Sequence, residues 1–434
     1  MTEINPLDNS WRYLRSWTNA DHELEGIIAT FWDSSATLTV PHLMNHFPVI
    51  EALCNLYMRF GNPRLLDYAR GYAEFFVRHR EADGIFGHAW GDVPPKGTGT
   101  VHQAAASAAL LSLAEATQEQ QYLQLAVENL QACQQRWPGI LLNGVANQAM
   151  KYIQALMQLR ALSPEDYQRV AAPVDRYVAE MQSIITPARF GGRFIDQSAY
   201  NNFWMSCYEA KCLHGLSALA QADLHADWAI ETMNAVVEAL LNNHHLGNGL
   251  FISHSDYAEN LAVKLLRLSV GVSRRLPLGA RAIDIERLRR AFTARLSAPV
   301  DTIAPIWLAR MADTAYIFSQ IKPWLSVPID DVQRLMHQQL VDNQQAHGGV
   351  PNVVGAWMSG MSAWERQVCS TRWNAYVFRY FAQQSSADLD IEVASFTDEV
   401  RREDDFVLVT ETPGQVVAEL KASRMRYQWS KPAQ

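Results

Sequence analysis

Apolar residues recur at helical spacing along most of the chain, in two kinds of segment that alternate. The first kind is amphipathic: residues 64–79 place apolar side chains on one side and Arg64, Asp67 and Arg70 on the other, which is typical of a helix with one solvent-facing side. The second kind is apolar nearly all round. Residues 101–116 are rich in alanine, which predicts a helix buried on every side. The alternation therefore predicts pairs of helices, each with an inner and an outer member.

The same reading extends along the chain. We expect inner helices at 42–60, 101–116, 145–159, 203–220, 256–274, 302–320 and 363–384. We expect outer helices at 64–79, 119–136, 164–185, 225–242, 284–296 and 330–343. One or two short helices are expected within residues 11–31.

Glycine-rich loops that carry aromatic, His and Asp residues precede several of the inner helices. They include residues 83–88, 190–204, 247–256 and 347–352. The turns in the opposite direction are short, as at Gly61-Asn62-Pro63. Because binding residues gather on long loops, we expect the functional site on the rim formed by the inner-helix N-termini. The positive ends of these helices favour an anionic group there.

This repeat predicts an all-α fold, either an α/α toroid of about six helical hairpins or a solenoid of such hairpins. The character of the sequence changes after Ser385. Two β-prone segments flank Pro413-Gly414, which is a hairpin signal, and residues 425–429 are a further strand candidate. We therefore expect an α/α toroid catalytic domain at 1–387 and a short β appendage at 388–434.

Composition removes several classes of function. The net charge is -8 and no basic stripe occurs, so nucleic acid is not an expected partner. No apolar run reaches the ~20 residues that span a bilayer, and the polar N-terminus lacks a signal core, which predicts a cytoplasmic protein that does not enter a membrane. The five cysteines are scattered without a C-x-x-C pair, which argues against a disulfide framework and structural zinc. We expect no metal and no cofactor.

The helical pattern as a whole and two local segments resemble known sugar-processing enzymes. Helical hairpins with aromatic glycine-rich loops, over about residues 40–385, resemble the (α/α)6 toroids of glycoside hydrolases, polysaccharide lyases and sugar epimerases. Residues 200–205 are similar to the aromatic-Asp-Asp-x-x-Met start of an inner helix in unsaturated glucuronyl and rhamnogalacturonyl hydrolases. An Asp is the general acid/base there, whereas this chain has Asn201 and Asn202. Residues 42–53 are similar to the His-x-His-x-x-Glu-Ala helix of N-acylglucosamine and cellobiose 2-epimerases.

The candidate catalytic residues are Asp196, His254 and Asp256. Each lies in a glycine-rich loop before an inner helix, where a carboxyl or imidazole group can transfer a proton to a bound ligand. Asp196 and Asp256 could equally serve as helix caps. Candidate substrate-binding residues on the same predicted rim are His88, Trp90, Asp92, Arg193, Tyr200, Trp204, His347 and Trp357.

These residues favour an enzyme that binds a sugar or oligosaccharide, including anionic ones, and that catalyses hydrolysis, β-elimination or epimerisation. Hydrolysis needs two carboxyl groups beside one bond, whereas elimination and epimerisation need a base near a proton alpha to a carbonyl. Two alternatives remain open. One is a toroidal isomerase or cyclase that acts on a terpenoid-like substrate, and the other is a non-catalytic helical-repeat binding protein.

Overall fold

The computed structural model describes most of the chain. The described residues are 5–18, 22–24, 26–29, 36–39, 43–87, 100–137, 146–170, 174–188, 190–196, 203–252, 254–256, 305–356, 369–393, 406–412, 415–420 and 425–430. They belong to two compact units. The terminal unit comprises Met1–Cys133, Asn343–Asn352 and Ala363–Gln434, and the central unit comprises Gln134–Asp342 and Val353–Ser362. The expected helices at 256–274 and 284–296 lie outside the described residues.

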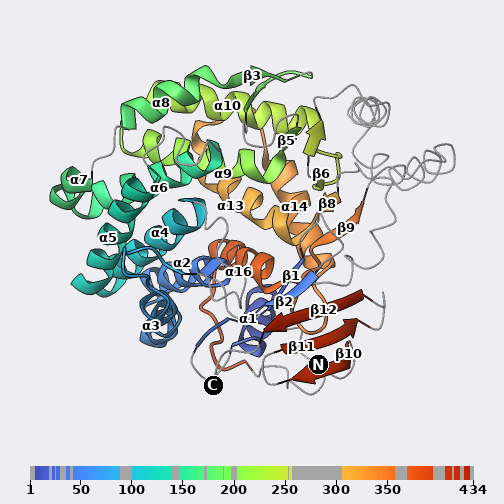
Figure 1. The fold of residues 1–434 in the computed structure, drawn as a ribbon. Helices are drawn as coiled ribbons and strands as arrows, with labels where there is room; N and C mark the ends of the chain where they lie inside the picture. The colour runs from blue at the N-terminus through green and yellow to red at the C-terminus, as the bar shows by residue number, and fades with distance from the viewer. Residues whose placement is uncertain are drawn as a thin grey trace. The chain divides into compact units, whose positions relative to one another are not determined.

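The terminal unit is built around three inner helices that pack in the order α4, α2 and α16 (Figure 1). Helix α3 covers α2 and α4, and helix α1 packs on α16. The helices of this unit are α1 (Pro6–Ser16), α2 (Leu43–Phe60), α3 (Pro63–Arg78), α4 (Thr100–Thr117), α16 (Thr371–Gln384) and most of α5 (Gln120–Arg136). A short hairpin of β1 (Gly26–Ala29) and β2 (Ala36–Thr39) accompanies them.

The central unit repeats this arrangement, with inner helices in the order α6, α9 and α13. Outer helices α10 and α14 follow α9 and α13 in the chain and pack on them. The helices of this unit are α6 (Ala146–Leu162), α7 (Pro164–Val170), α8 (Val174–Ser183), α9 (Ser206–Gln221), α10 (Ala226–Asn243), α13 (Ala312–Ile321) and α14 (Asp330–Asp342), with short 3-10 helices η2 (Ala309–Met311) and η3 (Lys322–Trp324).

The sequence pattern explains which helices are inner and which are outer. The alanines of α4 are buried all round the helix, as predicted. Helix α3 buries one side only. It begins at Asn62 and Pro63: the Asn62 side chain accepts the amide of Arg64, and Pro63 has no N–H that would need a partner in the first turn. The alternation of inner and outer helices predicted from the sequence is confirmed over the described residues.

A tight hairpin follows each of the four outer helices α3, α8, α10 and α14. It is marked by the bridges Arg80↔Phe86 and His245↔Phe251 and by the strands β3 (Ile185–Pro187) and β4 (Arg193–Ile195). After α14 the amide of Gln345 donates to Gly349 O. Glycines with positive φ make these turns. At Gly192 no other residue fits, because a Cβ would lie 2.4 Å from Ala235 O.

A side chain from the fourth residue of an inner helix holds three of these turns, those after α3, α8 and α14, and also the segment at Leu24 that follows α1. These four residues, called the clamp residues below, are His46 of α2, Gln103 of α4, Glu209 of α9 and Asn374 of α16. Each accepts the backbone N–H of a buried residue at 2.7–3.1 Å, and the four N–H groups belong to Leu24, Phe86, Ile195 and Val350. Buried amides need such partners, so the clamps fix each loop against its inner helix.

Several expected elements differ from the structure. The expected outer helix at 164–185 is two helices, α7 and α8, and Pro173 lies between them, where a proline cannot donate the amide that a continuous helix needs. The expected inner helices at 203–220 and 302–320 begin with the strands β5 (Phe203–Met205) and β8 (Pro305–Trp307). Residues 26–29 form strand β1 and not a helix.

The C-terminal residues form the predicted β structure. Strands β10 (Phe406–Thr412), β11 (Gln415–Leu420) and β12 (Met425–Ser430) make an antiparallel sheet, and Pro413-Gly414 lies between the first two. The segment before this sheet is attached to α1. Trp11 Nε1 donates to Ile391 O at 3.2 Å, and the Asp390 amide donates to Asp8 Oδ1 at 2.8 Å.

Candidate functional site

The segment from Phe251 to Asp256 connects the beginnings of two inner helices. Strand β6 (Phe251–Ile252) pairs with β8, which precedes η2 and α13. Strand β7 (His254–Asp256) pairs with β5, which runs directly into α9. In the β5–β7 register Met205 lies opposite His254, and Phe203 lies opposite Asp256. The backbone of His254 and Asp256 is therefore held beside the three residues that directly precede α9.

Asp196 reaches the same end of α9 through a different contact. It follows strand β4, which lies against α9. The amide of Ile195 donates to Glu209 Oε2 at 3.1 Å, in the first turn of α9, and the amide of Asp196 donates to Ile184 O at 2.8 Å. The Asp196 carboxyl is half-buried, and this burial raises its pKa above the ordinary value. Asp196 thus keeps its proton to a higher pH than an exposed Asp.

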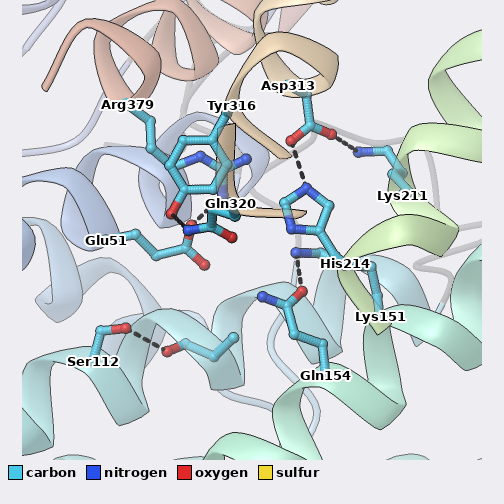
Figure 2. A network of polar contacts seen from close by, with 11 residues as sticks. Glu51, Ser112, Lys151, Gln154, Lys211, His214, Asp313, Tyr316, Gln320 and Arg379 are labelled. Atoms are coloured by element: carbon cyan, nitrogen blue, oxygen red, sulfur yellow. Dashed lines mark hydrogen bonds and ion pairs between the residues drawn. The ribbon is translucent and has the colours of Figure 1, made fainter. Parts of the chain in front are cut away.

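A buried charge cluster lies deeper on the same helix. Lys211 and His214 of α9 both contact Asp313, in the first turn of α13. Lys211 Nζ is 3.4 Å from Asp313 Oδ2, and His214 Nε2 is 3.0 Å from Asp313 Oδ1. Figure 2 shows both side chains directed at the Asp313 carboxylate. The spacing of three residues places Lys211 and His214 on one side of α9, and all three side chains are at most 7% exposed.

Further polar side chains adjoin this cluster. The Tyr316 ring of α13 stacks on the His214 ring at 5.9 Å between centroids. Lys151 of α6 is buried, and its Nζ donates to Gln154 Oε1 at 2.6 Å. Helix α6 packs on α9, and Figure 2 shows the Lys151 side chain pointing toward His214. A carboxylate that holds an imidazole in one orientation prepares it for proton transfer.

The structure locates part of the predicted site. The side chain of Arg193 is exposed and pairs with Glu231 at 3.6 Å. His347 belongs to the terminal unit, where its ring lies 5.4 Å from that of Tyr13 and its Nδ1 accepts the amide of Gly349. The backbone of Trp204 lies in β5. The other predicted binding residues, His88, Trp90, Asp92, Tyr200 and Trp357, lie outside the described residues.

The polar residues of the helix that resembles the 2-epimerases contact other parts of the terminal unit. His46 is a clamp residue and stacks on Phe75 at 4.1 Å. Glu51 pairs with Arg379 of α16, and both side chains are buried. These contacts give His46 and Glu51 a structural role within the terminal unit.

Sequence reasoning missed the cluster of Lys211, His214 and Asp313. A signal was present, because Lys211 and His214 are basic residues three positions apart on a helix that is otherwise apolar nearly all round. Their acidic partner lies 102 positions from Lys211, and no local pattern identifies it. Glu209 was missed for the same reason, since its partner is a backbone amide of the preceding loop.

Within the described residues no group of three or more His, Cys, Asp or Glu residues is arranged to hold a metal ion. None of the described helices combines the length and the apolar composition that crossing a membrane requires.

The chain is similar in structure to several solved carbohydrate enzymes, whereas no family model and no curated protein matches its sequence. A sugar epimerase from a ruminal bacterium has a TM-score of 0.56 at 12% identity, covering 88% of this chain and 96% of that one. Cellobiose 2-epimerase from Bacillus thermoamylovorans has a TM-score of 0.54 at 9% identity, with coverage of 88% and 100%. A family 88 glycosyl hydrolase from Bacteroides vulgatus has a TM-score of 0.51 at 11% identity, with coverage of 87% and 97%.

These likenesses agree with the succession of inner and outer helices in each unit. The fold is all-α, of the α/α toroid class, with small accessory sheets. The fold class predicted from the sequence is confirmed.

Proposed function

We propose that this protein is an enzyme that processes a sugar by general acid/base catalysis at the beginning of α9. The observation that carries the proposal is the convergence of two loop segments, which carry three candidate catalytic residues, on that helix end. Asp196 reaches it through the Ile195–Glu209 bond, and His254 and Asp256 reach it through the β5–β7 pairing. All three were candidate catalytic residues on sequence grounds alone, and their convergence supports a shared role.

The chemistry of Asp196 fits a general acid. Its raised pKa lets it carry a proton closer to neutral pH, where it can protonate a leaving oxygen. Asp256 is then the second carboxyl group that hydrolysis requires. For elimination or epimerisation the base is an imidazole, supplied by His254 or by His214, which Asp313 holds in place.

The similar structures support a sugar substrate, because those proteins are described as a sugar epimerase, a cellobiose 2-epimerase and a glycosyl hydrolase. An anionic sugar suits the positive end of α9. We expect the enzyme to act in the cytoplasm on a small sugar or oligosaccharide.

The test is a panel of neutral disaccharides, oligouronides and unsaturated uronides incubated with the purified protein in D₂O. Proton NMR separates the three reactions: new reducing ends indicate hydrolysis, a new alkene signal indicates elimination, and deuterium beside the carbonyl indicates epimerisation. Binding of a panel sugar without turnover would favour the non-catalytic alternative. The absence of both binding and turnover with every panel sugar would contradict the proposal.

Two substitutions then assign the reacting groups. If Asp196 is the acid, Asp196→Asn lowers kcat by roughly 10²–10⁴, the usual contribution of a positioned acid or base. If His214 is the base, His214→Asn lowers kcat by a similar factor. The matched controls are Asp175→Asn and His225→Asn, because Asp175 and His225 form a His–Asp pair at the surface of the same unit, 2.7 Å apart. Wild-type turnover in both Asp196→Asn and His214→Asn would remove these residues from the mechanism.

A further inference from the structure

Two asparagine side chains join the last glycine-rich loop to the first turn of α16. Asn374 of α16 accepts the Val350 amide at 2.7 Å and donates to Val350 O at 2.9 Å. In the other direction, Asn352 of the loop accepts the Ser370 amide at 3.0 Å, and Ser370 is the N-cap residue of α16. The loop and the helix end are therefore fixed against each other at two points within the terminal unit.

Two polar groups at this junction have no hydrogen-bond partner in the part of the chain that the structure describes. They are Asn352 Nδ2 and Ser370 Oγ, and both residues are 0% exposed. The bond from the Ser370 amide identifies the oxygen of the Asn352 side chain, so the group without a partner is the NH₂, which has two donors. The Ser370 hydroxyl makes no capping bond to α16, although serine is a preferred N-cap residue.

A buried polar group without a partner is unfavourable, because it has lost its bonds to water and gained none in return. The clamp residues Gln103 and Asn374 show the usual arrangement, since both ends of each amide group are bonded. Native proteins keep few exceptions, and each one needs an explanation such as a bound ion or an ordered water. The junction of Asn352 and Ser370 therefore indicates an occupant.

The chemistry of the junction favours an anionic occupant. Asn352 Nδ2 can only donate, and the Ser370 hydroxyl can donate, so the occupant must offer acceptor oxygens. The positive end of α16 adds to this preference, and its first turn contains Arg372 and no acidic residue. Water would satisfy the same two groups, but it would make no use of the charge at the helix end.

We propose that the loop at residues 347–352 and the first turn of α16 bind the carboxylate or phosphate group of a small anionic ligand, which accepts hydrogen bonds from Asn352 Nδ2 and Ser370 Oγ. His347, a candidate binding residue on sequence grounds, begins this loop and accepts the Gly349 amide. The inference goes beyond the proposed function, because it uses no residue of α9 and assumes no reaction.

The test uses Asn352→Asp and Ser370→Ala in the full-length protein. Aspartate has the shape of asparagine and still accepts the Ser370 amide, but it replaces the two donors by a negative charge that repels an anion. Alanine removes only a hydroxyl that makes no capping bond. Asn248→Asp is the matched control, because Asn248 Oδ1 also accepts a loop amide, that of Leu250, at 3.2 Å in the central unit.

Amide hydrogen exchange measured by mass spectrometry locates the bound anion. The probes are inorganic phosphate, glucose 6-phosphate and glucuronate at constant ionic strength, with glucose as the neutral probe. We expect an anion to slow exchange saturably in peptides that cover residues 347–352 and 370–374, and glucose to leave these peptides unchanged. Protection by glucose 6-phosphate but not glucuronate identifies a phosphate group as the ligand, and the reverse result identifies a carboxylate.

The variants then test the two donors. Asn352→Asp should weaken the protecting anion's binding at least about tenfold, which is the effect of losing a bond to a charged group. Ser370→Ala should weaken it about fivefold or more, and it gives the same information if Asn352→Asp does not fold. Asn248→Asp should bind the anion as the wild type does.

Three results would overturn this inference. The first is that no probe anion changes exchange in these peptides. The second is equal protection in the wild type and in both Asn352→Asp and Ser370→Ala, which is expected if water alone occupies the junction. The third is protection confined to peptides at the beginning of α9. That last result would support an anionic ligand at the proposed catalytic site and refute only the site at α16, so the two proposals fail separately.

Discussion

Replacing Gln103 by methionine tests whether the clamps hold the loops in place. Gln103 Oε1 accepts the Phe86 amide at 3.0 Å, and its Nε2 donates to Phe86 O at 2.8 Å. Methionine has a similar length and shape but makes neither bond. Phe86 is 0% exposed, so both backbone groups lose their partner away from water. Each stranded group costs about 1–3 kcal/mol, so the two together should lower the free energy of unfolding by roughly 2–6 kcal/mol.

Urea denaturation followed by tryptophan fluorescence measures this loss, and hydrogen exchange locates it. We expect faster exchange in the loop around Phe86. Gln103→Glu keeps the acceptor but removes the donor and buries a carboxyl group, so it should cost at least as much as one lost bond, about 1–3 kcal/mol or more. The control is Gln121→Met on the exposed side of α5, which should change stability by less than about 0.5 kcal/mol. A Gln103→Met protein as stable as this control would refute the view that the clamps fix the loops.

Three further predictions concern other parts of the molecule. Asp313→Asn should destabilise the protein by about 3–5 kcal/mol, because it leaves Lys211 buried beside a neutral side chain. The control Asp175→Asn, in an exposed pair with His225, should cost about 0–1 kcal/mol. Equal losses of stability in denaturant unfolding would contradict this distinction between the buried and the exposed pair. The raised pKa of Asp196 means that its stabilising contribution is present below its unfolded pKa and is lost as the pH rises through the folded value. As the pH rises through this range, Asp196→Asn should therefore gain stability relative to the wild type. A difference in melting temperature between the two proteins that stays constant over this pH range would argue against a buried acid. Truncation after Val393 should keep cooperative helical unfolding. Truncation after Ala387 should lower the melting temperature, because it removes the bonds from Trp11, Arg15 and Asp8 to residues 390–393. Identical melting of the two truncated proteins, measured by circular dichroism, would show that residues 388–393 do not anchor α1.

The pattern of apolar and polar residues was sufficient to predict most helices and the fold class. Segments such as 43–60 and 100–117 are helical within one or two residues of the expected bounds. The reason is that helical periodicity is a local property: the residues that make a side of a helix apolar are three or four positions apart. Glycines and aromatic residues likewise marked the loops, since positive φ angles are local too.

The composition of the candidate site depended on contacts that the sequence does not display. The strand β5 was expected to be the first turn of a helix, and it is extended because its backbone pairs with β7, about fifty positions later. Asp313 lies 99 positions from His214, and Glu209 lies 14 positions from the amide that it accepts. Which of many buried polar residues meet is decided when helices pack, because each buried polar group must find a partner and only the packed helices bring the partners within reach. The sequence by itself thus determined where the inner helices and loops lie along the chain, and the tertiary structure decided which of their side chains act together.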